Sequence, residues 1–400
     1  MTKYTPMMQQ YLEIKSQHPD TLLFFRLGDF YEMFFNDAEV ASRELEIVLT
    51  ARDGGDAGKV PMCGVPHHSA HTYIAKLISR GYRVAICEQV EDPREAKGLV
   101  KREVVRIITP GTVLEDNMLS ETSANYLAAV YTGDEAAGLA FVDVSTGEFK
   151  ICQWQGKNAL NQIYTELLRL NPSECLMAED QPTLWMEEQS YLTNLPIVTA
   201  EFPTSFNTAC QVLLNHFKVA TLESFGIDNS YDLAVFAAAA ILDYLEKTCQ
   251  ANLHHLRTIS IHHDEQYLHM DIATRRNLEL TSTIRDGKRE GSLLSILDYC
   301  CTAMGRRRLK NWIELPLRDL SAIQARHDAV QELKDNLQLR SDLRRALSEV
   351  YDMERLAGKI GSQMATPRDL IALKQSLKKT ETVKELLQGT SSNLLINISK

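Results

Sequence analysis

The chain reads Leu22-Leu-Phe-Phe-Arg-Leu-Gly-Asp-Phe-Tyr-Glu-Met-Phe-Phe35 near its start, and this stretch decides how the surrounding residues fold. Two apolar, strand-like runs flank the pair Gly28-Asp29, and glycine at the first turn position is what a tight type II′ hairpin accepts. Side chains alternate along a strand, so Phe30 and Glu32 are expected on one face, opposite to Tyr31. The stretch therefore predicts a hairpin with an aromatic ring and a carboxylate side by side next to its turn.

Two interpretations of this hairpin stay open. In the first, it is a plain amphipathic hairpin with Phe30 in the core and Glu32 facing solvent. In the second, Phe30 is a wedge, because an aromatic side chain pushed between base steps from the minor groove kinks the duplex at a cost that falls where bases are mispaired. A carboxylate beside DNA is repelled by phosphates, so Glu32 is useful there only if it accepts a hydrogen bond from a base. The wedge would read deformability more than sequence.

Around the hairpin, residues 22–110 alternate strand-like runs with helical patterns, which is typical of a mixed α/β unit. Asn36-Asp37 should act as the N-cap of a helix that extends to Val48, and a second helix over residues 73–78 should end before Gly81.

A second α/β unit is expected from residue 126 onward. Three strand-like runs predict an antiparallel meander, over residues 126–131, 138–144 and 148–154. Helical patterns and short strands then alternate, with helices over 158–170, 205–217 and 231–249 and strands near 174–178 and 196–200. This order resembles an RNase H-type sheet.

After residue 270 only helical patterns remain, over 271–283, 292–312, 321–350 and 366–389. The expected fold class is therefore a multidomain chain, α/β followed by all-α. We place a mixed-sheet α/β domain at 1–117, an RNase H-like α/β domain at 118–260, and an incomplete helical domain at 261–400.

Charge is distributed unevenly along the chain. The formal net charge is -10. Residues 1–120 carry 14 Lys and Arg against 17 Asp and Glu, residues 121–260 carry 6 against 17, and residues 261–400 carry 23 against 19. The acidic middle third is repelled by phosphate and suits contact with protein, whereas the flanking thirds can still present basic patches. Net charge therefore does not exclude nucleic acid as a ligand.

Several features favour a cytoplasmic protein without a membrane segment. The 8 cysteines include no CxxC pair, which is typical of reduced thiols. The first residues lack the apolar core of a secretory signal. The longest apolar run, 233–242, is about half of the roughly 20 residues that span a bilayer, so it predicts a buried helix.

Four other motifs contain residue types that can carry chemistry. The text Gly54-Gly-Asp-Ala-Gly-Lys-Val60 has the wrong spacing for a P-loop and no hydroxyl for Mg²⁺, so a surface loop is favoured. His67-His68-Ser-Ala-His71 lacks further metal ligands and is favoured as a helix N-terminal turn. Asp143 lies where an RNase H-type nuclease carries a metal carboxylate, but an exposed or turn-facing aspartate is favoured. The basic run Arg306-Arg-Arg308 is favoured as a solvated helix face over a DNA contact.

Several motifs in order along the chain resemble those of the MutS family, the bacterial DNA mismatch-recognition proteins. The resemblance begins with Gly28-Asp-Phe-Tyr-Glu32, which is similar to the Phe-x-Glu mismatch-reading motif of that family. It continues through Pro61-Met-Cys-Gly-Val-Pro-His67, Val84-Ala-Ile-Cys-Glu-Gln-Val90, Ile107-Ile-Thr-Pro-Gly-Thr112, Thr274-Arg-Arg-Asn-Leu-Glu-Leu280, Gly291-Ser-Leu-Leu-Ser-Ile-Leu-Asp298 and Met304-Gly305. It covers nearly all 400 residues.

The resemblance implies a mismatch-binding domain, a connector domain and a helical lever domain. It implies that Phe30 stacks on the mispaired base and that Glu32 hydrogen-bonds it. It further implies contacts to the DNA backbone or groove from the matching motifs, by Gly28, Asp29, Arg52, His67 and Arg102. Phosphate contacts of this kind set register without reading sequence.

The resemblance also implies partners and cofactors beyond these residues. ATP and Mg²⁺ are expected in the ATPase domain that the family carries downstream, and no cofactor, metal or catalytic residue is expected within the chain up to Lys400. The full-length family forms homodimers, and MutL-type repair proteins are expected to meet the connector. The expected function is recognition of mispaired and unpaired bases to initiate mismatch repair. The alternatives are a metal-dependent nuclease on the RNase H-like domain and a non-DNA-binding interaction scaffold.

Overall fold

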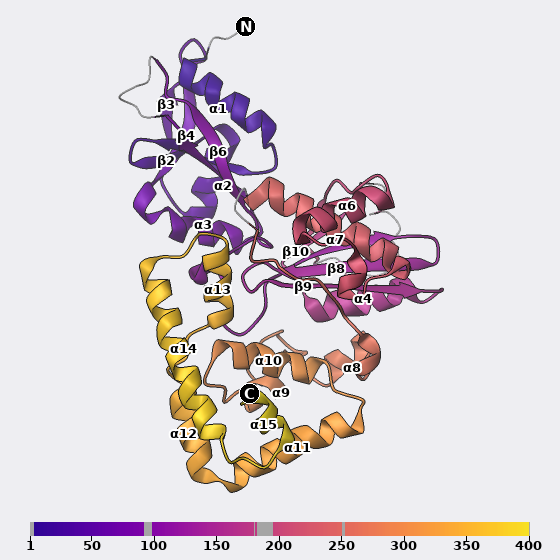
Figure 1. The fold of residues 1–400 in the computed structure, drawn as a ribbon. Helices are drawn as coiled ribbons and strands as arrows, with labels where there is room; N and C mark the ends of the chain where they lie inside the picture. Colours follow the sequence, from indigo (N-terminus) through magenta and orange to yellow (C-terminus); the bar gives the residue numbers. More distant parts are fainter. Residues whose placement is uncertain (1–3, 92–97, 180, 182–194, 250–252, 400) are drawn as a thin grey trace.

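The computed structural model of the chain describes residues 4–91, 98–179, 181, 195–249 and 253–399. Two β-sheet regions follow one another, and a helical region completes the described chain (Figure 1). The α/β plus helical fold class predicted from the sequence is therefore confirmed.

The first sheet contains six strands in the order β3-β4-β2-β1-β5-β6. Their bounds are β1 Leu22–Leu27, β2 Phe30–Phe34, β3 Thr50–Asp53, β4 Lys59–Pro66, β5 Val84–Gln89 and β6 Arg102–Ile108. One face packs on α1 (Pro6–Gln17) through Met8 and Tyr11. The other face packs on α2 (Phe35–Leu45) and α3 (Ala70–Ile78). Alternate residues of each central strand therefore enter different apolar cores.

The predicted hairpin is present at the centre of this sheet. Strands β1 and β2 pair antiparallel with Leu27 opposite Phe30, which leaves Gly28 and Asp29 as the two turn residues. Gly28 has φ +58°, whereas Asp29 is not among the residues with positive φ. Positive φ at the first turn position alone is the type II′ signature, so the predicted turn type is confirmed.

The predicted cap of the first helix is wrong. Helix α2 begins at Phe35 and ends at Leu45, so Asp37 lies in its first turn. The Asp37 carboxylate is buried and accepts hydrogen bonds from the Tyr11 hydroxyl at 2.9 Å and the Leu23 backbone N–H at 3.0 Å. Val48 lies outside the helix and is exposed. The carboxylate hydrogen-bonds to residues distant in the sequence and therefore does not cap the helix.

The second sheet has the order β11-β10-β7-β8-β9-β12. Its strands are β7 Tyr126–Thr132, β8 Ala136–Asp143, β9 Glu148–Gln155, β10 Glu174–Met177, β11 Ile197–Thr199 and β12 Ser260–Ile261. The first three form the predicted antiparallel meander, and β10 and β11 add in parallel beyond β7. This is the RNase H-type order that the sequence indicated.

Helices cover both faces of the second sheet. Helix α4 (Ala159–Leu170) packs on one face, and α6 (Phe206–Phe217) and α7 (Asp232–Cys249) pack on the other. The apolar run 233–242 lies in α7 and is mostly buried, as predicted. Gly138 permits this close packing, because a Cβ atom there would lie 2.2 Å from the backbone nitrogen of Ala234.

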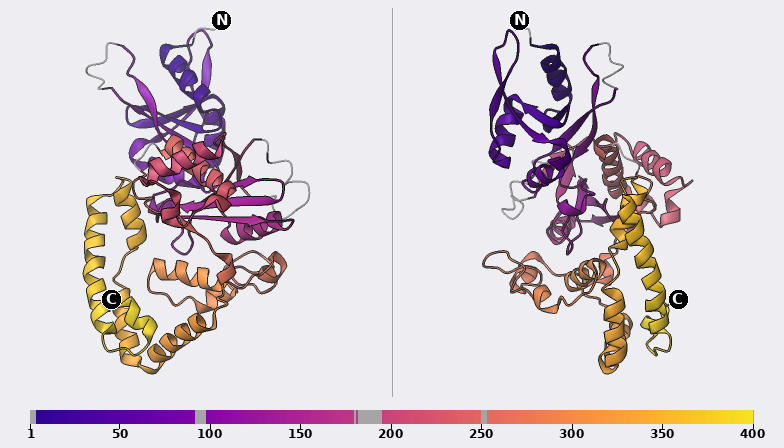
Figure 2. Two further views of the ribbon diagram at one scale, coloured as in Figure 1. Left: turned by 45° about the vertical axis from the view of Figure 1, so that its right-hand side comes forward. Right: turned by 90° about the vertical axis from the view of Figure 1, so that its left-hand side faces the viewer.

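The described residues after 270 form helices, as predicted, but several predicted stretches are divided. Their bounds are α8 Ile272–Asn277, α9 Leu293–Leu297, α10 Ala303–Glu314, α11 Leu320–Asp335, α12 Leu337–Leu347, α13 Met353–Gly361, α14 Pro367–Leu387 and α15 Asn393–Ile398. Asn336 caps α12 and separates it from α11, and the prediction missed α13. Figure 2 shows α11, α12 and α14 extending away from both sheets. The short α13 returns to the sheets (Figure 1).

All eight cysteines are present as free thiols. Within the described ranges, no helix combines the length and the apolar character needed to cross a membrane.

Candidate nucleic-acid interface

Phe30 lies at the exposed start of β2, next to the hairpin turn. Its side chain is 47% exposed, whereas Tyr31 is 5% exposed and Met33 is fully buried. The alternation along β2 sends Tyr31 and Met33 into the core beneath α2 and α3. The interpretation that placed Phe30 in the core is therefore wrong, and the ring is available to a ligand.

Glu32 shares the Phe30 face of the sheet but is more enclosed. Its side chain is 16% exposed and forms an ion pair with the Arg52 guanidinium. Its partner on β4 is Gly64, where a Cβ atom would lie 3.4 Å from the Glu32 Cγ. The missing side chain at Gly64 therefore leaves room for the Glu32 carboxylate. The interpretation that placed Glu32 in open solvent is also wrong.

Four more of the predicted contact residues lie near Phe30 and Glu32 in the structure. Arg52 lies on β3 with its side chain 39% exposed. His67 is exposed, and its backbone N–H donates a hydrogen bond of 2.8 Å to the Asp29 carbonyl. Gly28 and Asp29 form the turn itself. An exposed ring, a carboxylate, a guanidinium and an imidazole therefore surround one hairpin tip.

Arg102 does not join this group as a free cation. It is 6% exposed, and its guanidinium donates hydrogen bonds to the Arg26 carbonyl at 2.8 Å and to the Gln10 side chain at 3.0 Å. It also lies over the Phe25 ring at 5.0 Å, and burial lowers the pKa of Arg102. Because protein acceptors already hold this guanidinium, the predicted phosphate contact at Arg102 is corrected to a structural role.

The opposite face of the hairpin is held by polar contacts. The Tyr31 hydroxyl donates a hydrogen bond to the Glu88 carboxylate on β5, and the Arg26 guanidinium lies 5.5 Å from the Tyr31 ring centre. Burial, together with the Glu88 carboxylate, raises the pKa of Tyr31. These contacts fix β2 from behind, so Phe30 projects from a rigid strand rather than from a mobile loop.

The two motifs considered for phosphate or metal binding have structural roles. His67–Ser69 forms a short 3₁₀ turn that leads into α3, as predicted. In the loop between β3 and β4, the Gly54 N–H donates to the Gly58 carbonyl at 2.8 Å, which closes a tight turn. The parts of the chain that the structure describes contain no cluster of three or more His, Cys, Asp or Glu side chains that could hold a metal ion.

Asp143 is turn-facing, as favoured from the sequence. It is fully buried at the end of β8, where it accepts hydrogen bonds from the Ser145 hydroxyl at 2.6 Å, the Ser145 N–H at 2.9 Å and the Asn125 N–H at 3.0 Å. Burial raises the pKa of this carboxyl, and the three donors oppose that effect. The carboxylate thus stabilises the β8–β9 turn.

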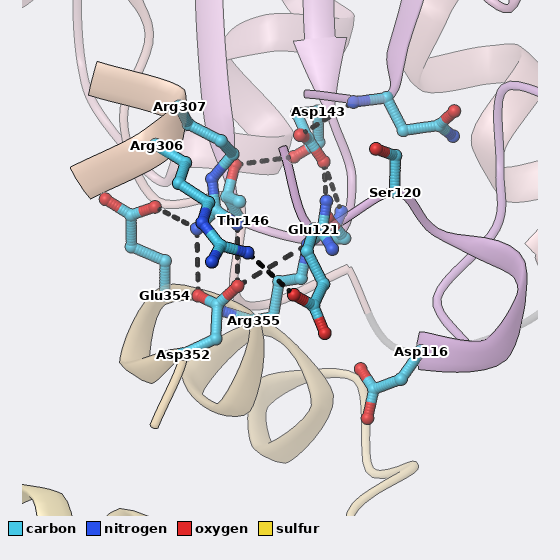
Figure 3. Close-up of polar contacts among 12 residues, drawn as sticks. Asp116, Ser120, Glu121, Asp143, Thr146, Arg306, Arg307, Asp352, Glu354 and Arg355 are labelled. Atoms are coloured by element: carbon cyan, nitrogen blue, oxygen red, sulfur yellow. Dashed lines mark hydrogen bonds and ion pairs between the residues drawn. The ribbon is translucent and has the colours of Figure 1, made fainter. Parts of the chain in front are cut away.

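Two arginines of the basic run on α10 pair with carboxylates of the protein, whereas Arg308 is exposed, so the run is only in part the solvated helix face that was favoured (Figure 3). Arg307 is 9% exposed and pairs bidentately with Asp352 at 2.6 and 2.8 Å. Arg306 pairs with Glu121 at 3.1 Å. Neither cation is free to bind phosphate, because each is matched by a carboxylate from a distant part of the chain.

Sequence reasoning missed the polar joint between the two sheets. Glu174 is 1% exposed and accepts hydrogen bonds from Thr109 at 2.5 Å, from the Gly111 N–H at 3.1 Å and from the Tyr244 hydroxyl. Tyr244 in turn accepts one from the Arg83 guanidinium at 3.2 Å. The sequence feature that could have indicated this joint is a glutamate at the start of an otherwise apolar strand. A carboxylate buried at that position needs hydrogen-bond donors around it.

The fold and this site define a class of multidomain chain. Its mixed α/β domain presents an aromatic ring and a carboxylate at a hairpin tip, and an RNase H-type domain and a helical domain follow. Family models described as MutS domain I, MutS domain II and MutS domain III match residues 5–117, 125–257 and 273–398. The chain belongs to the MutS family.

Curated relatives match over almost the whole chain. The DNA mismatch repair protein MutS of Syntrophomonas wolfei is 53% identical over 398 residues, covering 99% of this chain and 46% of the relative. Those of Acetivibrio thermocellus and Symbiobacterium thermophilum are 48% and 47% identical, with 45% and 46% of each relative covered. The chain thus spans less than half the length of these relatives.

Proposed function

We propose that this chain recognises mispaired and unpaired bases in duplex DNA and so initiates mismatch repair. The observation that carries the proposal is the exposed Phe30 beside the enclosed Glu32 on a rigid hairpin. The relatives are named DNA mismatch repair protein MutS, which agrees with this function.

Phe30 acts by intercalating from the minor groove. The ring separates two base steps and kinks the duplex, which costs a few kcal/mol of stacking. A mispaired base has already lost part of its pairing and stacking, so the same distortion costs less there. Glu32 then accepts a hydrogen bond from an N–H group of the displaced base.

The hairpin surroundings position the DNA. His67 and the turn residues Gly28 and Asp29 contact the backbone or groove near the wedge. Contacts to phosphate carry no sequence information and set the register of the duplex on the protein. This arrangement agrees with recognition by deformability, in which the sequence around the lesion matters little.

The remaining parts of the chain connect recognition to repair. The residues 1–117 form the mismatch-binding domain, 118–260 the connector and 261–400 part of the lever. The connector's excess of acidic residues suits contact with MutL-type repair proteins rather than with DNA. Homodimerisation and the use of ATP and Mg²⁺ belong to the full-length family protein. The chain itself has no catalytic role, and the protein acts in the cytoplasm.

The test is a binding measurement on the protein at its natural length. Affinity is measured for a duplex with one G·T mispair and for its paired control, at two salt concentrations. Phe30→Ala should abolish the preference for the mispair. Val48→Ala is the matched control, because Val48 is another exposed apolar residue of the same domain at 83% exposure.

Each result has a defined meaning. Glu32→Ala should weaken binding to the mispair while tightening binding to the paired duplex, since a charge repelled by phosphate is removed. An unchanged preference in Phe30→Ala would refute the wedge. Cleavage of DNA with Mg²⁺ or Mn²⁺ that Asp143→Asn abolishes would favour a nuclease, and failure to bind any duplex would favour an interaction scaffold.

A further inference from the structure

The two oxygens of the Glu32 carboxylate differ in their hydrogen bonding. Oε2 accepts a hydrogen bond from Nη1 of Arg52. Within the ranges that the structure describes, no hydrogen bond to Oε1 is found. The carboxylate is therefore held at one oxygen, and the other is open to a ligand.

We propose that Arg52 is the positioning residue for Glu32: it holds Oε2 so that Oε1 is presented to the displaced base. The inference rests on the proposed function, because it assigns to Glu32 the base contact described above. It gives Arg52 a role different from the phosphate contact that the family resemblance implied.

The contact between Arg52 and Glu32 crosses an intervening strand of the sheet. Arg52 is on β3 and Glu32 is on β2, and β4 lies between these strands. Gly64 is the β4 residue opposite Glu32. A Cβ atom there would lie 3.3 Å from the Tyr31 carbonyl and 3.4 Å from the Glu32 Cγ, so a larger residue would crowd the carboxylate. The glycine therefore leaves room for the Glu32 carboxylate on this face of the sheet.

Burial explains why Glu32 needs this partner. The Glu32 side chain is 16% exposed, whereas that of Arg52 is 39% exposed. A carboxylate that has lost most of its hydration requires a compensating charge or hydrogen bond. A charge-assisted hydrogen bond from a planar guanidinium also restricts the orientation of the carboxylate.

One consequence for DNA binding follows. The paired guanidinium removes rotational freedom from the Glu32 carboxylate before binding, so less entropy is lost when Oε1 meets the base. This effect depends on Glu32 being present. A phosphate contact by Arg52 would not depend on it.

That dependence defines the experiment, a double-mutant cycle in the protein at its natural length. The quantity measured is the ratio of Kd for the paired duplex to Kd for the G·T duplex, in Arg52→Gln, Glu32→Ala and the double variant. Arg43→Gln is the matched control, because Arg43 is an exposed arginine of the same domain with a side chain 68% exposed. Thermal unfolding of every variant checks that the domain is folded.

The expected result is non-additive. Arg52→Gln and Glu32→Ala should each lower the ratio by about tenfold, the scale of one hydrogen bond to a charged group. The double variant should lose no more than Glu32→Ala alone. Arg52→Lys should retain part of the ratio, because an ammonium supplies the charge without the planar geometry. The salt dependence of binding to paired DNA should be the same in Arg52→Gln as in the unmodified protein.

Two other results would overturn the inference, and they differ from each other. If Arg52→Gln weakens all duplexes alike, adds fully to Glu32→Ala, and lowers the slope of log K against log salt by about 0.9, then Arg52 is a phosphate contact. The proposed function would survive that outcome. If Glu32→Ala leaves the ratio unchanged, the base contact itself is absent, and the proposed function of Glu32 fails together with the role of Arg52.

Discussion

Gly358 of α13 lies directly against the carbonyl oxygen of Ser145 in the β8–β9 turn: a Cβ atom on Gly358 would be 2.1 Å from that oxygen. Three residues further along, a Cβ atom on Gly361 would be 2.4 Å from the Cβ of His255. One face of α13 is thus reduced to backbone where it meets the second sheet domain. This contact, together with the Arg306–Glu121 ion pair, joins the helical region to that domain (Figure 3).

Gly358→Ala should therefore loosen this junction. The added methyl group cannot be accommodated against a backbone oxygen, so α13 or the turn must move, at about 1–3 kcal/mol. Hydrogen exchange of α13 and of residues 143–147 should become faster, and the urea midpoint should fall. Ala357→Ser, on the exposed side of the same helix, should change stability by less than about 0.5 kcal/mol. Equal effects of the two substitutions would contradict the close contact.

Two phenylalanines of β2 should separate stability from recognition. Phe34 is fully buried and packs on Tyr11 with ring centres 5.1 Å apart, so Phe34→Ala should cost about 3–5 kcal/mol of unfolding free energy. Phe30→Ala should cost much less, because the ring is 47% exposed. Chemical denaturation of both variants tests this. A large stability loss in Phe30→Ala would indicate that the ring supports the fold.

The Arg307–Asp352 pair should behave as one unit. Arg307→Ala leaves the enclosed Asp352 carboxylate without its bidentate partner, and breaking a buried pair costs about 3–5 kcal/mol. Asp352 also has a lowered pKa, because the bonds and charge of Arg307 outweigh the opposing effect of burial. The double variant Arg307→Ala/Asp352→Ala should be less destabilised than the sum of the single ones. Arg345→Ala serves as the control, since that side chain is 74% exposed.

Stability should fall in mildly acid solution, partly because of His262. Burial lowers the pKa of His262 below 6.5, and the nearby Glu166 only partly opposes this. The unfolded chain therefore binds a proton at a higher pH than the native one, so folding loses free energy as the pH falls through 6.5. His262→Gln should reduce the difference in urea midpoint between pH 7.5 and pH 5.5. These two pH values lie about one unit above and below the ordinary pKa of histidine.

The neighbouring His263 provides the comparison for that measurement. It is exposed, so His263→Gln removes a histidine of the same segment without disturbing the core. A residual dependence is expected in His262→Gln, because burial also lowers the pKa of His216. If both substitutions have the same effect on the urea midpoints, the pH dependence of stability does not arise from the buried His262.

Much of the fold could be predicted because its signals are local. The Gly28-Asp29 turn, the alternation of Phe30 and Tyr31, and the meander after residue 126 depend on backbone preferences within a few residues. The predicted helix over 158–170 agrees with α4 to within one residue. These features need no knowledge of which distant segments meet.

The errors arose where a charged residue had a distant partner. Asp37 is an acceptable N-cap by its local sequence, but Tyr11 and Leu23 take its carboxylate. Arg102 looks like a free cation in sequence, yet acceptors from α1 and β1 enclose it. Charged residues are predicted to be exposed from their residue type alone. Residue type gives no information on which distant segments of the chain pack against them.

The sequence by itself determined that an aromatic ring and a carboxylate share one face beside a hairpin turn, because alternation along a strand is a property of the backbone. Only the tertiary structure decided that Phe30 stays exposed and that Glu32 is held by Arg52. In that pairing, β4 lies between the two strands, and Gly64 is opposite Glu32. Strand order and register are set by the packing of the whole domain, and the contacts of a side chain across a sheet follow from them.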